Sequence, residues 1–164
     1  MIDFTSAEKE INCNKEILIK KLSDFILTDV LLFWSGNEEL KKIQQEKWSP
    51  ILNWLKNHFS VNMEKTYNID IPDGNKAYQK TFEKIINSMD CKSLTAFYLT
   101  ATRTKSPLLA IAMINKKISP EEAFDMSYLE EIYQSKKWGI DEKSEKIRKK
   151  IASELKEIYE YMDK

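Results

Sequence analysis

The sequence contains few of the residues that build cross-links, metal sites or nucleophilic triads. In 164 residues there are two cysteines, Cys13 and Cys91, and one histidine, His58. Two cysteines cannot form a disulfide framework, and neither they nor His58 have partners at the spacing of metal ligands. We therefore expect free thiols, no bound metal and no nucleophile activated by a neighbouring base.

Glycine and long apolar runs are also scarce. The three glycines stand singly, which excludes a glycine-rich phosphate loop, so we expect no nucleotide or other cofactor. The longest apolar run, Pro107–Ile114, is far shorter than the roughly 20 residues of a membrane span. The first residues lack a basic segment followed by an apolar one, so we expect no secretory signal and a location inside the cell.

The charge distribution gives no sign of a nucleic acid partner. Basic and acidic residues number 26 each, so the formal net charge is zero. A basic cluster within residues 146–150 is diluted by glutamates on the same predicted helix, a pattern typical of a solvated helix face. We expect neither nucleic acid binding nor insertion into a membrane.

The scarcity of glycine and proline favours an all-α fold, because few turns are left to separate strands. Three of the four prolines follow a serine, at Ser49-Pro50, Ser106-Pro107 and Ser119-Pro120. Each pair predicts an N-cap followed by the first residue of a helix. Glu122, three residues after Ser119, predicts a capping box at the last of these starts.

Apolar residues recur every three or four positions, which predicts about six to seven helices in one domain, residues 1–164. The stripes run from Leu18 to Phe33, Leu40 to Leu55, Tyr78 to Met89, Leu94 to Ala101 and Ile147 to Met162. We expect the second stripe to form two shorter helices bent at Pro50. The segment Pro107–Ile114 lacks a polar face and should be the enclosed central helix.

One stretch departs from helical spacing. Apolar residues occupy odd-numbered positions, at Val61, Met63, Tyr67, Ile69 and Ile71. The sequence Pro72-Asp73-Gly74 comes next and is typical of a turn. The pattern predicts a short extended segment or hairpin near residues 61–71.

Asp29 lies inside an apolar stripe, three residues after Ile26. A carboxylate in that position needs hydrogen-bond partners if it is buried. Two interpretations stay open. Either the helix ends near Asp29, which is hydrated or caps a neighbour, or Asp29 is a buried, hydrogen-bonded acid that fixes the fold.

The segment Met126–Asp141 is expected to form a helix with two different faces. The apolar face consists of Tyr128, Leu129, Ile132 and Tyr133. The roughly opposite arc consists of Ser127, Glu131, Gln134 and Trp138. An indole in line with a carboxylate and an amide favours a surface that faces a partner protein. The alternative is that Trp138 folds back over the helix end beside Gly139 and covers the core.

Several motifs, taken in order, resemble a known family. The most specific is the element Glu131, Gln134, Trp138 and Gly139 with Asp141-Glu142 after it, and the others are Thr28-Asp29, the spacing of Trp48, Pro50, Leu52 and Trp54, and the stretch Ser106 to Ala123. Together they resemble the Atp-twelve type of assembly chaperones, found in mitochondria and alphaproteobacteria, which bind the α subunit of the ATP synthase catalytic head. The resemblance covers roughly Lys15 to the C-terminus.

The resemblance implies a chaperone and not an enzyme. Such a protein would hold a newly made α subunit, without ATP, until the β subunit takes over. Glu131 matches the functionally important acid of the family, and Gln134, Trp138 and Gly139 complete the match. With the helical arc that also holds Ser127, the expected partner-binding residues are Glu131, Gln134, Trp138 and Ser127. The residues expected to be structural or to complete the family motifs are Asp29, Trp48, Pro50, Trp54, Gly139 and Asp141.

The resemblance also implies an organisation and a location. We expect the chain to correspond to the helical C-terminal part of the family, without the N-terminal, mostly β domain of typical members. We expect a monomer whose partner is the unassembled α subunit. It would be located in the bacterial cytoplasm, or in the mitochondrial matrix of a eukaryote. The alternative is a helical scaffold or regulator that binds a different protein through the same stripe.

Overall fold

The protein is all-α, as the composition predicts. The structure is a computed structural model that describes all 164 residues, Met1–Lys164. It has nine α-helices and no sheet. The helices are α1 (Phe4–Cys13), α2 (Lys15–Phe25), α3 (Glu38–Phe59), α4 (Gln79–Asn87), α5 (Cys91–Thr104), α6 (Pro107–Ile114), α7 (Pro120–Ser127), α8 (Leu129–Trp138) and α9 (Glu142–Met162). Short 3-10 turns lie at Ile26–Thr28, Val30–Leu32 and Asp73–Tyr78.

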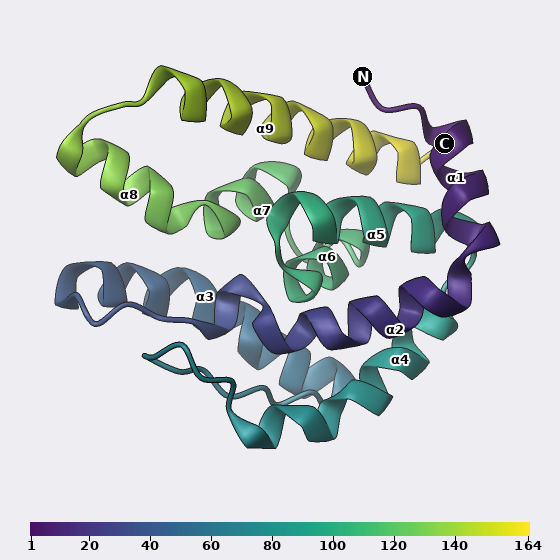
Figure 1. The fold of residues 1–164 in the computed structure, drawn as a ribbon, viewed down its shortest axis with the longest axis horizontal. Coiled ribbons are helices and arrows are strands. Elements are labelled where there is room, and N and C mark those ends of the chain that lie inside the picture. Colours follow the sequence, from purple (N-terminus) through teal and green to yellow (C-terminus); the bar gives the residue numbers. More distant parts are fainter.

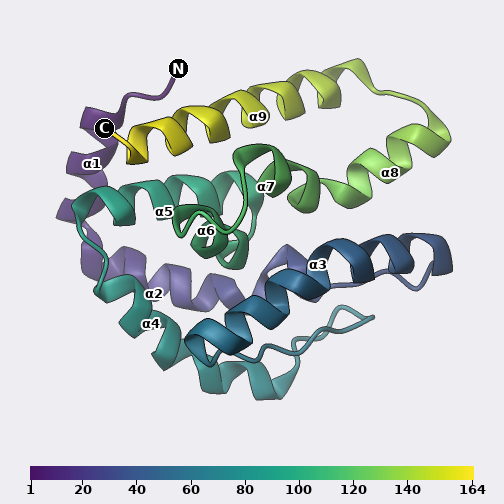
Figure 2. The same cartoon turned by 180° about the vertical axis from the view of Figure 1, so that it is seen from behind.

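The helices surround a central pair, α5 and α6 (Figure 1). Helix α5 also packs against α1 and α9, while α2 packs against α4 and α7 against α9. Both chain termini lie beside α1 at one end of the molecule, and the connection from α8 to α9 lies at the opposite end, as Figure 2 shows from behind. This far end carries the residues that the sequence marks for partner binding.

Helix α6 is the enclosed central helix that its apolar composition predicts. Every residue of Pro107–Met113 is buried. The hydroxyl of Ser106 accepts a 2.9 Å hydrogen bond from the Leu109 amide and so caps the helix. Ser119 and Glu122 form the expected capping box at the start of α7. These two predicted helix starts are confirmed.

The prediction of a helix start at Ser49-Pro50 is wrong. Helix α3 runs without a break from Glu38 to Phe59 and contains Pro50 in its interior. Asn37 caps it by accepting hydrogen bonds from the amides of Glu39 and Leu40. The buried residues Leu40, Trp48, Ile51 and Leu55 lie on both sides of the proline. Burial of this continuous face stabilises the helix enough to tolerate a proline that removes one backbone donor.

The predicted hairpin near residues 61–71 is also wrong. The segment after α3 forms one isolated parallel bridge, between Phe33 and Thr66. The side-chain amide of Asn75 accepts from the Glu64 amide at 2.6 Å and donates to the Glu64 carbonyl at 2.9 Å. Asn75 thus provides the hydrogen bonds that a partner strand would otherwise provide. Val61 and Met63 are nevertheless buried, which explains the first part of the alternating pattern, whereas Tyr67 and Ile69 are exposed.

The apolar stripe from Leu18 to Phe33 does not form one helix, because the chain turns at Asp29. Asp29 is 0% exposed and hydrogen-bonded, as the second of its two interpretations has it; as in the first, the helix ends near Asp29, which caps the Val30–Leu32 turn. Its carboxylate accepts hydrogen bonds from the Ser106 hydroxyl at 2.7 and 2.9 Å, from the Leu108 amide at 2.8 Å and from the Leu31 amide at 2.9 Å. Asp29 therefore ties the turn after α2 to the N-terminus of α6.

Candidate functional site

The expected partner-facing residues come from two helices and not from one. Helix α7 ends at Ser127 and helix α8 starts at Leu129. Tyr128 lies between them with φ −105° and ψ 17°. Its side chain is buried and its hydroxyl donates a 3.0 Å hydrogen bond to the Arg103 carbonyl. The backbone conformation at Tyr128 interrupts the helix that the sequence predicts across Met126–Asp141, and Ser127 therefore belongs to α7.

Three of the four residues share one exposed side of α8. Glu131, Gln134 and Trp138 are all exposed, at spacings that place them on neighbouring turns. The Trp138 side chain is 79% exposed, so it does not cover the core beside Gly139. Glu131 and Gln134 form no ion pair or side-chain hydrogen bond within the chain. The carboxylate, the amide and the indole are therefore free to contact another molecule.

An open groove of about 500 Å³ runs along this side of α8. It separates α8 from the first turns of α9 and reaches the end of α5. Its lining includes Ser127, Glu130, Glu131, Gln134, Ser135, Trp138, Gly139, Asp141, Ser144, Arg148, Tyr128 and Lys105. We call it the α8–α9 groove. A hollow of about 390 Å³ continues from it and adds Arg103, Ile147 and Ile151. The four expected residues meet in this groove although they belong to different helices.

Charges of both signs line the α8–α9 groove. Glu131 lies on the α8 wall and Arg148 on the α9 wall. Burial raises the pKa of the Tyr128 hydroxyl between them, the Glu131 carboxylate raises that pKa further, and Arg148 lowers it. The Arg148 guanidinium donates a 3.2 Å hydrogen bond to the Ser135 hydroxyl and so links the two walls. The groove suits a partner surface that carries both polar and apolar groups.

The turn from α8 to α9 closes the outer end of the groove. Gly139 has φ 104° and ψ 162°, a conformation that essentially only glycine adopts, and its amide donates to the Ser135 carbonyl at 3.0 Å. Asp141 precedes α9 and accepts a 2.7 Å hydrogen bond from the Ser144 hydroxyl, which lowers the pKa of Asp141. Ile140 and Ile147 are more than half exposed; Ile140 follows Trp138 by two residues, and Ile147 adds apolar surface in the inner hollow.

The remaining family-motif residues lie elsewhere. Trp48 is buried in α3, and its indole donates to the Met126 carbonyl. Pro50 lines a second groove of about 580 Å³ between α3 and the α7–α8 segment. Trp54 is half-buried against His58 and Phe59. Asp29 is buried beneath α6. These residues shape the fold around the groove and do not line it.

Sequence reasoning missed the basic side of the groove. Lys105 and Arg148 line the groove, and Arg103 lines its inner continuation. The chain has only two arginines in a sequence rich in lysine, and both reach this one place. That rarity was the available signal, since arginine is the residue suited to fixed, bidentate contacts.

The structure shows neither a cluster of metal ligands nor a membrane-spanning helix. No group of three or more histidine, cysteine, aspartate or glutamate side chains is arranged to hold a metal ion. None of the helices combines the length and the apolar character that crossing a membrane requires.

Comparison with known proteins gives related sequences and a shared fold. No family model matches the chain. The mitochondrial protein atp12 of Schizosaccharomyces pombe is 28% identical in an alignment 164 positions long. The alignment covers 93% of this chain and 55% of that protein. The chain thus spans about half the length of this curated relative.

Solved structures agree with this relationship. Atp12 from Paracoccus denitrificans superposes with a TM-score of 0.91 at 22% identity, over 96% of this chain and 68% of that chain. A candidate chaperone from Agrobacterium tumefaciens gives a TM-score of 0.79 at 22% identity, over 96% of this chain and 59% of that chain. At this level of identity the superpositions establish the fold. The chain is therefore similar in sequence to atp12 of Schizosaccharomyces pombe and shares the fold of Atp12 from Paracoccus denitrificans, which confirms the resemblance expected from its sequence.

Proposed function

We propose that the chain is an assembly chaperone of the ATP synthase that binds the free α subunit through the α8–α9 groove. One observation carries this proposal: Glu131, Gln134 and Trp138 lie exposed along one wall of an open groove, in a chain similar in sequence to atp12 of Schizosaccharomyces pombe. Ser127 lines the same groove from the end of α7. These are the four residues that the sequence marks for partner binding.

The exposure of Trp138 supports a protein partner. An indole that is 79% exposed leaves a large apolar area in water, and tryptophan is the residue most enriched among those that dominate binding energy. Ile140 and Ile147 extend the apolar area, and Glu131 and Gln134 add polar groups that can fix the orientation of a partner. The combination is typical of a transient interface, which has an apolar centre and a polar rim.

The proposed mechanism needs no chemical step. A free α subunit exposes apolar surface that the complete catalytic head buries, and such surface promotes aggregation. The chaperone covers part of it reversibly. The β subunit then displaces the chaperone because its interface with α is larger and overlaps the same surface. We accordingly propose a protein that is not an enzyme and that uses no ATP.

The proposal includes an organisation and a location. Residues 1–164 would act as one helical domain and as a monomer, equivalent to the helical C-terminal part of the family. The protein would act where new α subunits are found, in the bacterial cytoplasm or in the mitochondrial matrix.

The direct test is capture of the α subunit from cells that lack the β subunit. The tagged chain should retain the unassembled α subunit, and added β subunit should release it. Retention of a different protein, with the α subunit unbound, would contradict the proposal and favour a scaffold with another partner.

A further inference from the structure

The two walls of the α8–α9 groove are not held by packing on each other. Helices α8 and α9 do not pack closely together along their length. One hydrogen bond, from Arg148 to Ser135, links them across the groove. The distance between the walls must therefore be set by the elements on which both are anchored. These are α7, which packs against α9 and leads into α8, and the C-terminal part of α5, which contacts both α7 and α9.

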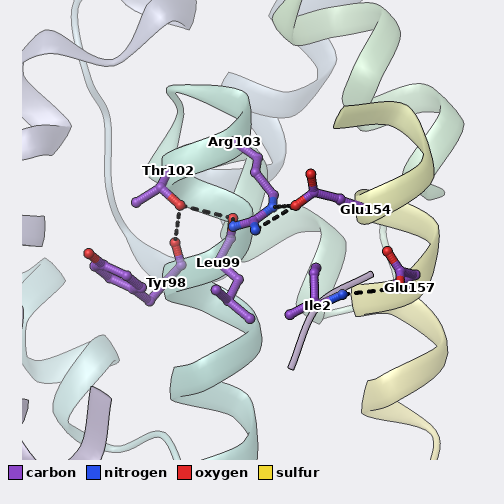
Figure 3. Close-up of polar contacts among 7 residues, drawn as sticks. All are labelled: Ile2, Tyr98, Leu99, Thr102, Arg103, Glu154 and Glu157. Atoms are coloured by element: carbon purple, nitrogen blue, oxygen red, sulfur yellow. Dashed lines mark hydrogen bonds and ion pairs between the residues drawn. The ribbon is translucent and has the colours of Figure 1, made fainter. Parts of the chain in front are cut away.

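Arg103 of α5 anchors the α9 wall (Figure 3). Its Nε and Nη2 atoms each lie 2.6 Å from Oε2 of Glu154 on α9. Its Nη1 atom donates a 3.2 Å hydrogen bond to the Leu99 carbonyl of its own helix. The guanidinium is thus fixed at one end to α5 and at the other to α9, and both side chains of the ion pair are largely buried.

The same residue anchors the α8 wall through its backbone. The carbonyl of Arg103 accepts the hydrogen bond from the Tyr128 hydroxyl. Tyr128 is the residue at which α7 ends and α8 begins. The start of α8 and the middle of α9 are consequently attached to a single position of α5, and that position lines the inner end of the groove.

We propose that Arg103 is a positioning residue that sets the width of the α8–α9 groove and thereby the affinity for the partner. The part of this inference that concerns affinity rests on the proposed function, and the part that concerns groove width does not. Arginine suits the task because its planar guanidinium makes several fixed hydrogen bonds at once, which a lysine ammonium cannot reproduce. A largely buried ion pair such as Arg103–Glu154 is also less screened by salt than a surface pair.

The variants Arg103→Met and Glu154→Gln remove the ion pair from either side. Glu157→Gln is the matched control, because Glu157 also lies on α9 but contacts the Ile2 amide at 3.3 Å, away from the groove (Figure 3). The exchanged pair, Arg103→Glu with Glu154→Arg, tests whether the contact itself matters. Circular dichroism should give the same helix content for all of them.

The first measurement is the distance across the groove. Spin labels at Lys136→Cys on α8 and Lys149→Cys on α9, with Cys13 and Cys91 replaced by serine, report this distance by pulsed electron paramagnetic resonance. We expect one narrow distribution in the parent and in Glu157→Gln. We expect a broader or shifted distribution in Arg103→Met and Glu154→Gln, and a return toward the parent in the exchanged pair. An unchanged distribution in both single variants would overturn the positioning role.

The second measurement is binding of the purified α subunit by the unlabelled variants. Kd should rise roughly fivefold or more for Arg103→Met and Glu154→Gln and stay at the parent value for Glu157→Gln. A changed distance with unchanged Kd would overturn the link between groove width and affinity. If the parent itself does not bind the α subunit, the proposed function fails, while the distance measurement still decides whether Arg103 positions the walls.

Discussion

The indole of Trp48 donates a 2.9 Å hydrogen bond to the carbonyl of Met126, 78 positions later in the chain. The contact joins α3 to α7 just before the turn at Tyr128 that starts α8. Trp48 is also buried and packs edge-on against Trp34, with ring centroids 6.0 Å apart. The orientation of α8 therefore depends on a residue that does not touch the groove.

Trp48→Phe should lower the free energy of unfolding by about 1–3 kcal/mol, because it leaves the Met126 carbonyl without its donor and creates a small cavity. Chemical denaturation followed by circular dichroism measures the change. Trp54→Phe is the control, since Trp54 is half-buried and donates no hydrogen bond, and it should cost less than about 1 kcal/mol. Equal losses in the two variants would show that the link to Met126 has no special weight.

Asp29 predicts a specific dependence of stability on pH. Burial raises the pKa of Asp29 from 3.8 to about 7, although the amides of Leu108 and Leu31 and the Ser106 hydroxyl oppose the shift. Between these values the folded protein binds more protons at this residue than the unfolded chain does. The contribution of Asp29 to stability is therefore complete below about pH 4 and falls as the pH rises to about 7.

Asp29→Asn isolates this contribution. The variant should be less stable at every pH. Its side-chain amide nitrogen cannot accept the hydrogen bonds that the carboxylate oxygen accepts, so a backbone or hydroxyl donor loses its partner. Its deficit relative to the parent should shrink between about pH 4 and pH 7 and stay constant above, as measured by urea denaturation across that range. A deficit that grows with pH would mean that the hydrogen bonds outweigh burial and hold Asp29 ionised.

Gly139→Ala should destabilise the turn between α8 and α9. The backbone at Gly139 has φ 104°, a conformation that is strained for alanine although nothing lies within 4 Å of the added Cβ. We expect a loss of about 1–3 kcal/mol in thermal or chemical unfolding. Gly36→Ala is the control, because Gly36 also has open space around it and has no such φ, and its stability should stay near that of the parent. A neutral Gly139→Ala would contradict the strain.

Local signals made part of this fold predictable. The N-caps Ser106 and Ser119 are predictable because the signal is local. The serine oxygen accepts a hydrogen bond from a free backbone amide of the first turn, and the proline after it has no amide hydrogen to satisfy. The buried helix α6 followed from its lack of a polar face. The side of α8 that carries Glu131, Gln134 and Trp138 followed from helical geometry, which depends only on spacing.

Tertiary contacts decided the features that the sequence did not predict. Pro50 indicates a helix start by local rules, but the buried face on both sides of it keeps α3 continuous. Tyr128 fits an apolar helical face, yet its backbone interrupts the helix there and leaves Ser127 in α7, while its hydroxyl bonds the Arg103 carbonyl. Asn75 replaces the strand partner expected for residues 61–71. Residue spacing within one element carries no information about such contacts, which reach 11 residues for Asn75 and Glu64 and 25 residues for Tyr128 and Arg103.

Trp138→Ala should separate binding from folding. The side chain is 79% exposed, so its removal should change the free energy of unfolding by less than about 0.5 kcal/mol. Binding of the α subunit should weaken by about 2 kcal/mol or more if the indole is a central contact. Isothermal titration calorimetry measures the second effect. Ile17→Ala, an exposed apolar residue of α2, is the control and should bind as the parent does.

The central claim is that the Glu131 side of α8 contacts the α subunit, and Glu131→Lys tests it most directly. The measurement is the Kd for the purified α subunit, beside Glu160→Lys, which makes the same charge change at an exposed position of α9 outside the groove. The account predicts normal helix content and melting for both variants, with Kd raised roughly tenfold or more for Glu131→Lys alone. A folded Glu131→Lys that binds as the parent does, or a Glu131→Lys that is unfolded, would contradict the account.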